Sequence, residues 1–346
     1  MYYGGILMIK LKKGIALLLS TLMILGLTAC SSKNENNING ESNNETSLDS
    51  DSHYPVTITT YNYKNEPVDI TFDKAPEKVV AVYQNSIETL LALGLEDKIE
   101  IAAGLDHEVK DEYKDAFSKV NYIEEFTPSK ETVVMEQPDF ILSWYSLFSD
   151  KNLGDVDYWH QNNINTYMAL NSGAAQDRTL ENEKADILNL GKIFNVEDKA
   201  NQIVNEIDTK TNEVENSVKD QEKQTTLIIE YMDGQIYTYG AKTLGGDMVQ
   251  KLGAELLNPN GGNISEEDLI KLNPDSIFVV YMDRTDEDMS KEAINTVMNN
   301  KALSSLNAIK NERVNSIALG EMYCSGIRTL DGINTFANGL YPNLNK

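Results

Sequence analysis

The ten residues VVMEQPDFIL at positions 133–142 decide the fold, because a similar segment, LIKLNPDSIF, occurs at positions 269–278. Each segment has the pattern of a helix end, a Pro-Asp break and a short apolar strand, since proline disfavours helix in the residue before it. Two further helix ends, at residues 90–94 and 248–253, both close with Leu-Gly. The repetition predicts two α/β lobes.

A long amphipathic helix is expected between the lobes. Its apolar stripe recurs at spacings of three and four residues, at Ala200, Ile203, Ile207, Thr211, Val214 and Val218. A helix of about 20 residues is roughly 30 Å long, which is enough to run from one domain to another. We therefore expect an α/β protein with an N-terminal lobe at residues 54–180, linking helices at 181–220 and a C-terminal lobe at 221–346.

Short apolar or alternating runs mark the expected strands. The N-terminal lobe is predicted to open with a hairpin and to continue with four strands, at residues 56–61, 68–72, 79–83, 99–103, 140–144 and 166–170. The C-terminal lobe is predicted to contain strands at residues 226–230, 236–239, 277–281 and 314–319, and to end in a helix near 329–339.

Residues 1–29 have the pattern of an export signal. Lys10, Lys12 and Lys13 precede an apolar run from Gly14 to Leu27, which is shorter than the roughly 20 residues of a membrane-spanning helix. The small residues before Cys30 give access to a peptidase, and the segment resembles a bacterial lipoprotein signal. That resemblance implies that Cys30 becomes the first mature residue and carries a lipid. Translation from Met1 and translation from Met8 both fit the sequence.

A polar tether is expected at residues 30–53. Residues 31–52 are almost entirely Ser, Asn, Asp, Glu, Lys and Gly, so they bury too little apolar surface to offset the entropy of ordering. A flexible linker of this length spans about 25 Å. We expect a protein held on the extracytoplasmic face of the cell membrane by its lipid.

The charge and the rare residue types exclude several functions. Lys and Arg number 30 against 54 Asp and Glu, a formal charge of −24, and such a surface repels the phosphates of nucleic acids. The two cysteines, Cys30 and Cys324, lie in unlike contexts and are not expected to pair. Three histidines provide little material for a metal site, so none is expected.

Several motifs together resemble a known family. They are residues 75–80 (APEKVV), 88–94 (ETLLALG), the two Pro-Asp segments, Gly-Gly at 245–246 and residues 264–269 (ISEEDL). From Ala75 to Pro342 the chain resembles the class III substrate-binding proteins of ABC importers for ferric siderophores, haem and cobalamin. The resemblance implies two lobes bridged by a long rigid helix, with a ligand cleft between them and modest closure.

The resemblance also implies a function and its partners. The protein would be a monomer that captures a ferric siderophore and delivers it to an ABC permease dimer, with cobamide and haem as alternative ligands. Glu88 and Glu267 would be the docking acids, one exposed carboxylate on each lobe facing arginines of the permease.

Ligand-binding residues are expected on the loops at strand ends that face the cleft. The candidates are Tyr83, Gln84, Asn85, Trp144, Tyr145, Asn171, Ser172, Arg178, Tyr231, Tyr239, Tyr281, Met282, Arg284, Met322, Tyr323 and Arg328. Their aromatic rings suit a bulky ligand that is partly apolar. Arg178, Arg284 and Arg328 would attract an anionic ferric complex, and Arg328 is the preferred candidate.

A solute-sensing lipoprotein and an exported enzyme are the alternatives from other classes. We expect no enzyme, because the sequence contains no Gly-x-Ser-x-Gly, no His-Glu-x-x-His and no phosphate loop. No cofactor is expected either. The role of Cys324 stays open, since a lone thiol is more often a small buried residue than a nucleophile.

Overall fold

The computed structural model describes residues 53–282 and 289–344. The predicted export signal, Cys30, nearly all of the predicted tether and Arg284 lie outside the described residues. Within the described ranges, no helix has both the length and the apolar character needed to cross a membrane.

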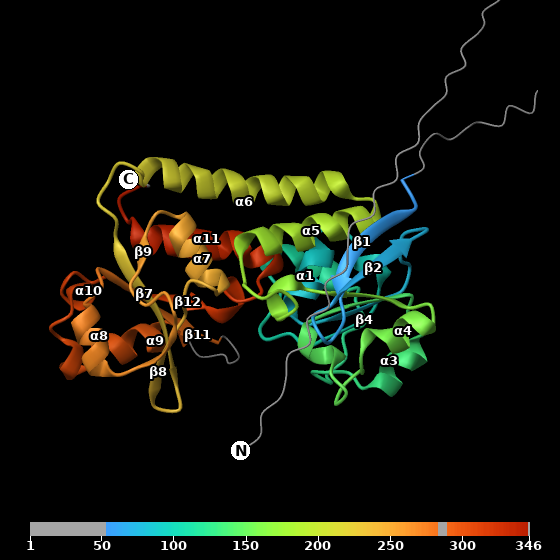
Figure 1. The fold of residues 1–346 in the computed structure, drawn as a ribbon, viewed down its shortest axis with the longest axis horizontal. Helices are drawn as coiled ribbons and strands as arrows, with labels where there is room; N and C mark the ends of the chain where they lie inside the picture. The colour runs from blue at the N-terminus through green and yellow to red at the C-terminus, as the bar shows by residue number, and fades with distance from the viewer. Residues whose placement is uncertain (1–52, 283–288, 345–346) are drawn as a thin grey trace, which may run out of the picture. The chain divides into compact units, whose positions relative to one another are not determined.

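The N-terminal lobe is built on a four-stranded parallel sheet in the order β4-β3-β5-β6 (Figure 1). Its strands are β3 (Val79–Val82), β4 (Ile99–Ala103), β5 (Phe140–Ser143) and β6 (Asn165–Met168). Its helices are α1 (Gln84–Ala92), α2 (Lys114–Phe117), α3 (Lys130–Glu136) and α4 (Val156–Gln161). All four residues of β3 are buried, as expected for the interior of a parallel sheet.

An antiparallel hairpin precedes this sheet, as predicted. It consists of β1 (Val56–Tyr61) and β2 (Pro67–Phe72), with Ile58 opposite Ile70. Those two side chains alternate with exposed neighbours and are buried, which is the period of a half-buried hairpin.

The C-terminal lobe contains a second sheet in the order β10-β8-β7-β11-β12, with β9 also paired to β7. Its strands are β7 (Thr225–Met232), β8 (Gln235–Thr238), β9 (Glu255–Leu256), β10 (Gly262–Ile264), β11 (Ser276–Tyr281) and β12 (Val314–Ala318). Its helices are α7 (Leu244–Lys251), α8 (Glu266–Leu272), α9 (Met289–Met298), α10 (Asn307–Lys310) and α11 (Thr329–Leu340). Strands β7, β11 and β12 are parallel, and β7 and β8 form the predicted hairpin.

Short 3-10 helices connect many of these elements. They are η1 (Glu96–Lys98), η2 (Asp111–Tyr113), η3 (Tyr145–Phe148), η4 (Leu170–Ser172), η5 (Lys301–Leu303), η6 (Leu319–Glu321) and η7 (Gly326–Arg328).

Two helices link the lobes, α5 (Leu180–Phe194) and α6 (Glu197–Val218), and α6 runs from one lobe to the other (Figure 1). The buried side of α6 has the predicted stripe, except that Val204 is buried where Ile203 was expected. Gly191 lets α5 approach α6 closely, since a Cβ there would lie 2.5 Å from the Cβ of Ala200. The predicted fold of two α/β lobes joined by a long helix is confirmed.

The repeated Pro-Asp segments have the same structure in both lobes. Helix α3 is capped by Ser129 and α8 by Ser265, and each helix ends in a left-handed residue directly before the proline. The aspartate then accepts backbone N–H groups at the start of the neighbouring strand. Asp139 accepts from Lys78 N at 2.9 Å, and Asp275 from Thr225 N at 3.0 Å.

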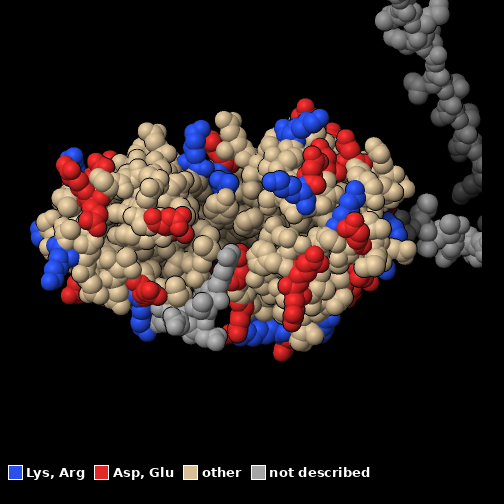
Figure 2. Space-filling model, turned by 90° about the horizontal axis from the view of Figure 1, so that it is seen from below, with Lys and Arg blue, Asp and Glu red and all other residues tan. Residues whose placement is uncertain are grey.

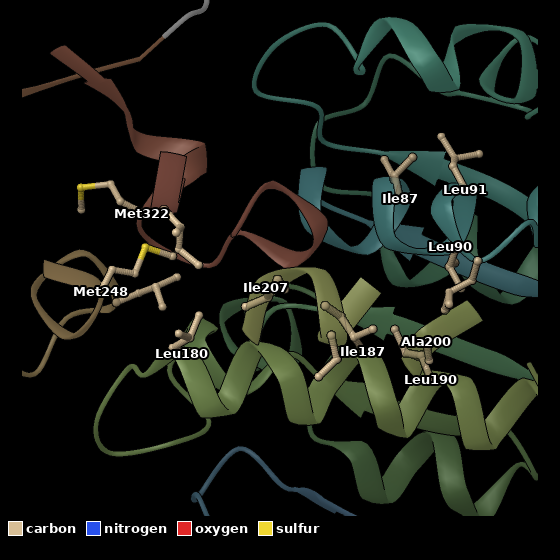
Figure 3. Close-up of a cluster of buried hydrophobic side chains, with 14 of the residues drawn as sticks. Ile87, Leu90, Leu91, Leu180, Ile187, Leu190, Ala200, Ile207, Met248 and Met322 are labelled. Carbon is tan, nitrogen blue, oxygen red and sulfur yellow. The ribbon is translucent and has the colours of Figure 1, made fainter. Parts of the chain in front are cut away.

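A single apolar cluster joins the lobes to the linking helices. It includes side chains of α1, α5, α6, α7 and the segment after β12, of which Ile87, Ile187, Ile207, Met248 and Met322 are examples (Figure 3). Because both lobes share this core with α5 and α6, their separation at this side would expose apolar surface.

Candidate functional site

A cavity lies between the lobes and is lined by residues of both. The N-terminal lobe contributes Gln84, Asn85, Asp106, His107 and Trp144, and the C-terminal lobe contributes Met282, Ala318, Leu319, Gly320, Tyr323, Cys324 and Ser325. Its volume is about 30 Å³, whereas pockets for small molecules hold several hundred Å³. The lobes therefore touch around the site, and a bulky ligand requires them to separate there.

The topology explains why these residues meet. In each lobe, the parallel strands point their carboxyl ends at the other lobe, and the lining residues follow those ends. Gln84 follows β3, His107 follows β4 and Trp144 follows β5, while Met282 and Gly320 follow β11 and β12. The carboxyl edge of parallel strands is the usual place for a ligand site in α/β proteins.

Aromatic side chains form a continuous layer across the boundary between the lobes. The ring of Trp144 lies 4.7 Å from that of Tyr83 and 5.8 Å from that of Tyr323, measured between centroids. The indole Nε1 of Trp144 donates to Asn85 Oδ1, which fixes the orientation of the ring. Tyr83 has φ 77°, a strained value for a bulky residue of the kind often found at functional sites.

Arg178 supports this layer from the linking segment. Its guanidinium lies 4.6 Å from the ring centroid of Tyr323, and its Nη2 donates to the hydroxyl of Tyr323 at 2.9 Å. Its Nε donates to the carbonyl of Asn171. The positive charge of Arg178 is thus held beside the cavity by contacts within the protein.

Five of the predicted ligand-binding residues line the cavity: Gln84, Asn85, Trp144, Met282 and Tyr323. Tyr83 and Arg178 contact the aromatic residues of the lining.

Other predicted residues lie away from the cavity lining. They are Tyr145, Asn171, Ser172, Tyr231, Tyr239, Tyr281, Met322 and Arg328. Met322 is fully buried in the shared core, and the hydroxyl of Tyr239 donates to the buried Glu230. Tyr145 stacks on Tyr63 next to the hairpin. These side chains stabilise the lobes around the site.

Sequence reasoning missed Asp106 and His107, which follow β4, and Gly320, which follows β12. The rule that ligand residues follow strand ends would have found all three, since both strands were predicted. The Nδ1 of His107 lies 3.1 Å from the carbonyl of Glu108, and its Nε2 has no hydrogen-bond partner among the described residues. A Cβ at Gly320 would lie 2.8 Å from that Nε2, so the glycine lets the lobes meet here.

The structure corrects the expected roles of Glu88 and Arg328. Glu88 has no exposed surface, and it accepts from Arg328 Nε at 2.6 Å and Arg328 Nη2 at 2.7 Å. Helix α1 packs against η7, so a carboxylate of one lobe meets a guanidinium of the other. Glu88 is therefore not the exposed acid that docking requires, and the Nε and Nη2 of Arg328 are not free for a ligand.

Two further contacts join the lobes near this bridge. Lys110 Nζ pairs with Asp331 at 2.8 Å. The buried Glu183 of α5 accepts from the backbone N–H groups of Ser325 and Gly326, at 3.1 and 2.6 Å. Burial raises the pKa of Glu183 to about 7, although its hydrogen bonds oppose the shift. We call these contacts of residues 325–331 with α1, Lys110 and α5 the cleft base.

The internal repeat pairs Glu267 with Glu131 rather than with Glu88. Both lie in the first turn of equivalent helices, two residues after the Ser129 and Ser265 caps. Glu267 is 79% exposed and forms a surface pair with Lys271 at 3.1 Å. Glu131 is also exposed, and none of the described cations pairs with it. The repeat, which the sequence shows, was the signal for this residue.

The first prediction concerns Glu183 and pH. Its folded pKa of about 7 lies above its ordinary value of 4.5, so the folded state binds more protons in this interval and stability falls as pH rises through it. Ionising Glu183 in the folded protein, once the pH is above this interval, therefore costs roughly 3 kcal/mol of unfolding free energy. We expect Glu183→Gln to flatten the fall in unfolding free energy between pH 4.5 and 7, measured by urea denaturation. The control variant Glu181→Gln, at an exposed position, should show the same fall in unfolding free energy as the parent. An unchanged slope in Glu183→Gln would contradict this account.

The second prediction concerns the bridge between the lobes. Arg328→Ala leaves the buried carboxylate of Glu88 without its cation, so we expect a loss of roughly 3–5 kcal/mol in unfolding free energy. The exposed pair of Lys114 and Asp111 provides the control, because Lys114→Ala should cost less than about 1 kcal/mol. Equal, small losses in both variants would show that the bridge does not hold the lobes together.

Comparisons with known proteins agree with this architecture. The sequence model of a family described as "Periplasmic binding protein" matches residues 79–318. The petrobactin-binding protein YclQ of Bacillus subtilis is 28% identical over 262 residues, covering 73% of this chain and 78% of that protein. The ABC transporter substrate-binding lipoprotein YvrC of the same organism is 26% identical over 300 residues, covering 84% and 86%.

Solved structures show the same similarity. A periplasmic binding protein from Veillonella parvula superposes with a TM-score of 0.79 at 34% identity, covering 84% of this chain and 93% of that one. The structure of YclQ gives a TM-score of 0.62 at 25% identity, covering 83% and 99%. The chain therefore belongs to the periplasmic binding protein family, which confirms the predicted resemblance to substrate-binding proteins of ABC importers.

Proposed function

We propose that this protein is the lipid-anchored, extracytoplasmic substrate-binding component of an ABC importer, and that it captures a ferric siderophore between its lobes. The observation that carries the proposal is the cavity lined by strand ends of both lobes, with Trp144 and Tyr323 facing each other across it. Among the relatives, YclQ is named for petrobactin, and an iron-uptake system-binding protein of Bacillus subtilis is 26% identical over 315 residues. These names favour a ferric siderophore over cobamide or haem.

We infer binding rather than catalysis at this site. The relatives above are named as binding proteins. Cys324, the thiol in the cavity lining, is buried, and burial raises its pKa well above the usual range, so the thiolate needed for attack is disfavoured. The Asn85 side chain donates to its sulfur, which fits a packing role.

The aromatic layer supplies the chemistry of recognition. Tyr323 and Trp144 offer ring faces to the planar groups of a siderophore, and the guanidinium of Arg178 behind Tyr323 provides positive charge next to an anionic complex. Trp144 and His107 of one lobe lie opposite Met282 and Gly320 of the other, and we call this part of the cleft the mouth. Since the cavity is about 30 Å³, the ligand can enter only when the two sides of the mouth separate. The cleft base stays closed during this movement, because the carboxylates of Glu88 and Glu183 that it holds are buried.

Docking to the permease is assigned to Glu131 and Glu267. Each is exposed in the first turn of a helix that its lobe holds rigidly, and the two positions are equivalent in the repeat. Two equivalent carboxylates suit a permease dimer, whose two-fold symmetry presents each cation twice.

The third prediction concerns the ligand site. Tyr323→Ala removes the ring that faces Trp144, so we expect about tenfold weaker binding of a ferric siderophore, equal to about 1.4 kcal/mol. The affinity is measured by quenching of tryptophan fluorescence, because Trp144 lies in the cavity wall. The control is Tyr158→Ala, which changes an exposed tyrosine of α4. If Tyr323→Ala binds a panel of ferric siderophores, cobamides and haem as the parent does, the cavity is not the ligand site.

The fourth prediction concerns docking. Glu131→Ala with Glu267→Ala removes two carboxylates that form charge-assisted hydrogen bonds to the permease, so affinity for it should fall by at least about tenfold. Affinity for the siderophore should not change. Binding to the reconstituted permease–ATPase complex tests this, with Glu206→Ala plus Glu215→Ala, on exposed positions of α6, as the control. Undiminished permease binding by the first double variant would disprove the docking assignment.

A further inference from the structure

Two exposed apolar residues occupy equivalent positions in the two lobes. Val134 of α3 is 43% exposed and Ile270 of α8 is 36% exposed. The segments that begin at residues 133 and 269 are the repeated pair, so Val134 and Ile270 correspond. A single exposed apolar side chain needs no explanation. Its recurrence at the same position of both lobes does need one.

Each apolar residue shares a helix face with an acid. Glu131 precedes Val134 by three residues and Glu267 precedes Ile270 by three, a spacing that makes the two side chains neighbours on the helix surface. The position directly before the apolar residue is fully buried in both lobes, at Val133 and Leu269, and anchors each helix. Each lobe therefore presents a carboxylate beside an apolar side chain on a fixed helix.

The two helices lie on one side of the molecule. In Figure 1, α3 and α8 both lie on the side away from α6, one in each lobe. Figure 2 views this side and shows carboxylates on both lobes. A partner that approaches from this side can contact the acid and the apolar residue of both lobes at once.

We propose that Val134 and Ile270 are apolar anchors for the permease, each seated in an apolar recess beside the cation that pairs with Glu131 or Glu267. This inference rests on the proposed docking function and adds to it the chemistry of the contact. The partner is a two-fold symmetric membrane protein that presents the same recess and the same cation twice. The acids align the protein by charge, and the apolar anchors, once desolvated, slow its release.

The test compares variants for binding to the permease–ATPase complex in lipid nanodiscs. Val134→Asn with Ile270→Asn should weaken binding about tenfold, chiefly through faster dissociation. The two single variants should each cause a similar part of the loss. Leu344→Asn is the matched control, since Leu344 is also 36% exposed and belongs to neither α3 nor α8. Siderophore affinity and thermal stability of every variant should equal those of the parent.

Each other outcome has a distinct meaning. If the apolar double variant binds the permease like the parent while Glu131→Ala with Glu267→Ala does not, the anchor inference is wrong and docking stands. If neither double variant loses binding, the anchor inference and the docking assignment are both wrong. Loss from only one of the two single variants would overturn the symmetric contact. If sedimentation shows that the parent self-associates and the apolar variant does not, the anchors join copies of this chain instead, which also overturns the inference.

Discussion

The buried ion pair between Glu88 and Arg328 is the interaction on which the arrangement of the two lobes depends. The carboxylate has no exposed surface, and its cation comes from the other lobe at 2.6 and 2.7 Å. Removal of one member of such a pair leaves an uncompensated buried charge, which costs more than the pair itself contributes. Glu183 fixes the same segment a second time, through the N–H groups of Ser325 and Gly326. Gly326 is required there, because a Cβ would lie 2.5 Å from Thr89 Oγ1.

This constraint divides the cleft into two parts with different tasks. The base carries buried charges and shares its apolar core with α5 and α6, so it resists opening. The mouth consists of side chains that meet across the lobes with few hydrogen bonds, such as Trp144 against Tyr323 and His107 against Gly320. A ligand that separates the mouth exchanges these contacts for its own. On the proposed function, the lobes can then grip it with a small movement, so that the spacing between α3 and α8 changes little.

The fold was predictable because its signals are local. The Pro-Asp repeats, the spacing of apolar residues in α6 and the short buried runs each follow from backbone preferences, and the structure has all of them. The lining of the candidate site was predictable in part, since Gln84, Asn85, Trp144 and Tyr323 follow strand ends. The burial of Glu88 was not, because it depends on how α1 meets η7, two segments far apart in the sequence. For the same reason, the pairing of Arg328 with Glu88 could not be foreseen. The equivalence of Glu131 to Glu267, by contrast, could have been found from the repeat alone.

The measurement that tests this account most directly is the distance between spin labels on the two lobes, with and without a ferric siderophore. Met135 of α3 and Lys271 of α8 are exposed positions for the labels, Cys30 would be replaced by serine, and Cys324 is buried. A fixed base with a separable mouth predicts one narrow distance distribution that shifts by a few ångströms when the ligand binds. A broad distribution in the free protein, or a shift several times larger, would show that the lobes move as separate bodies and would contradict the account.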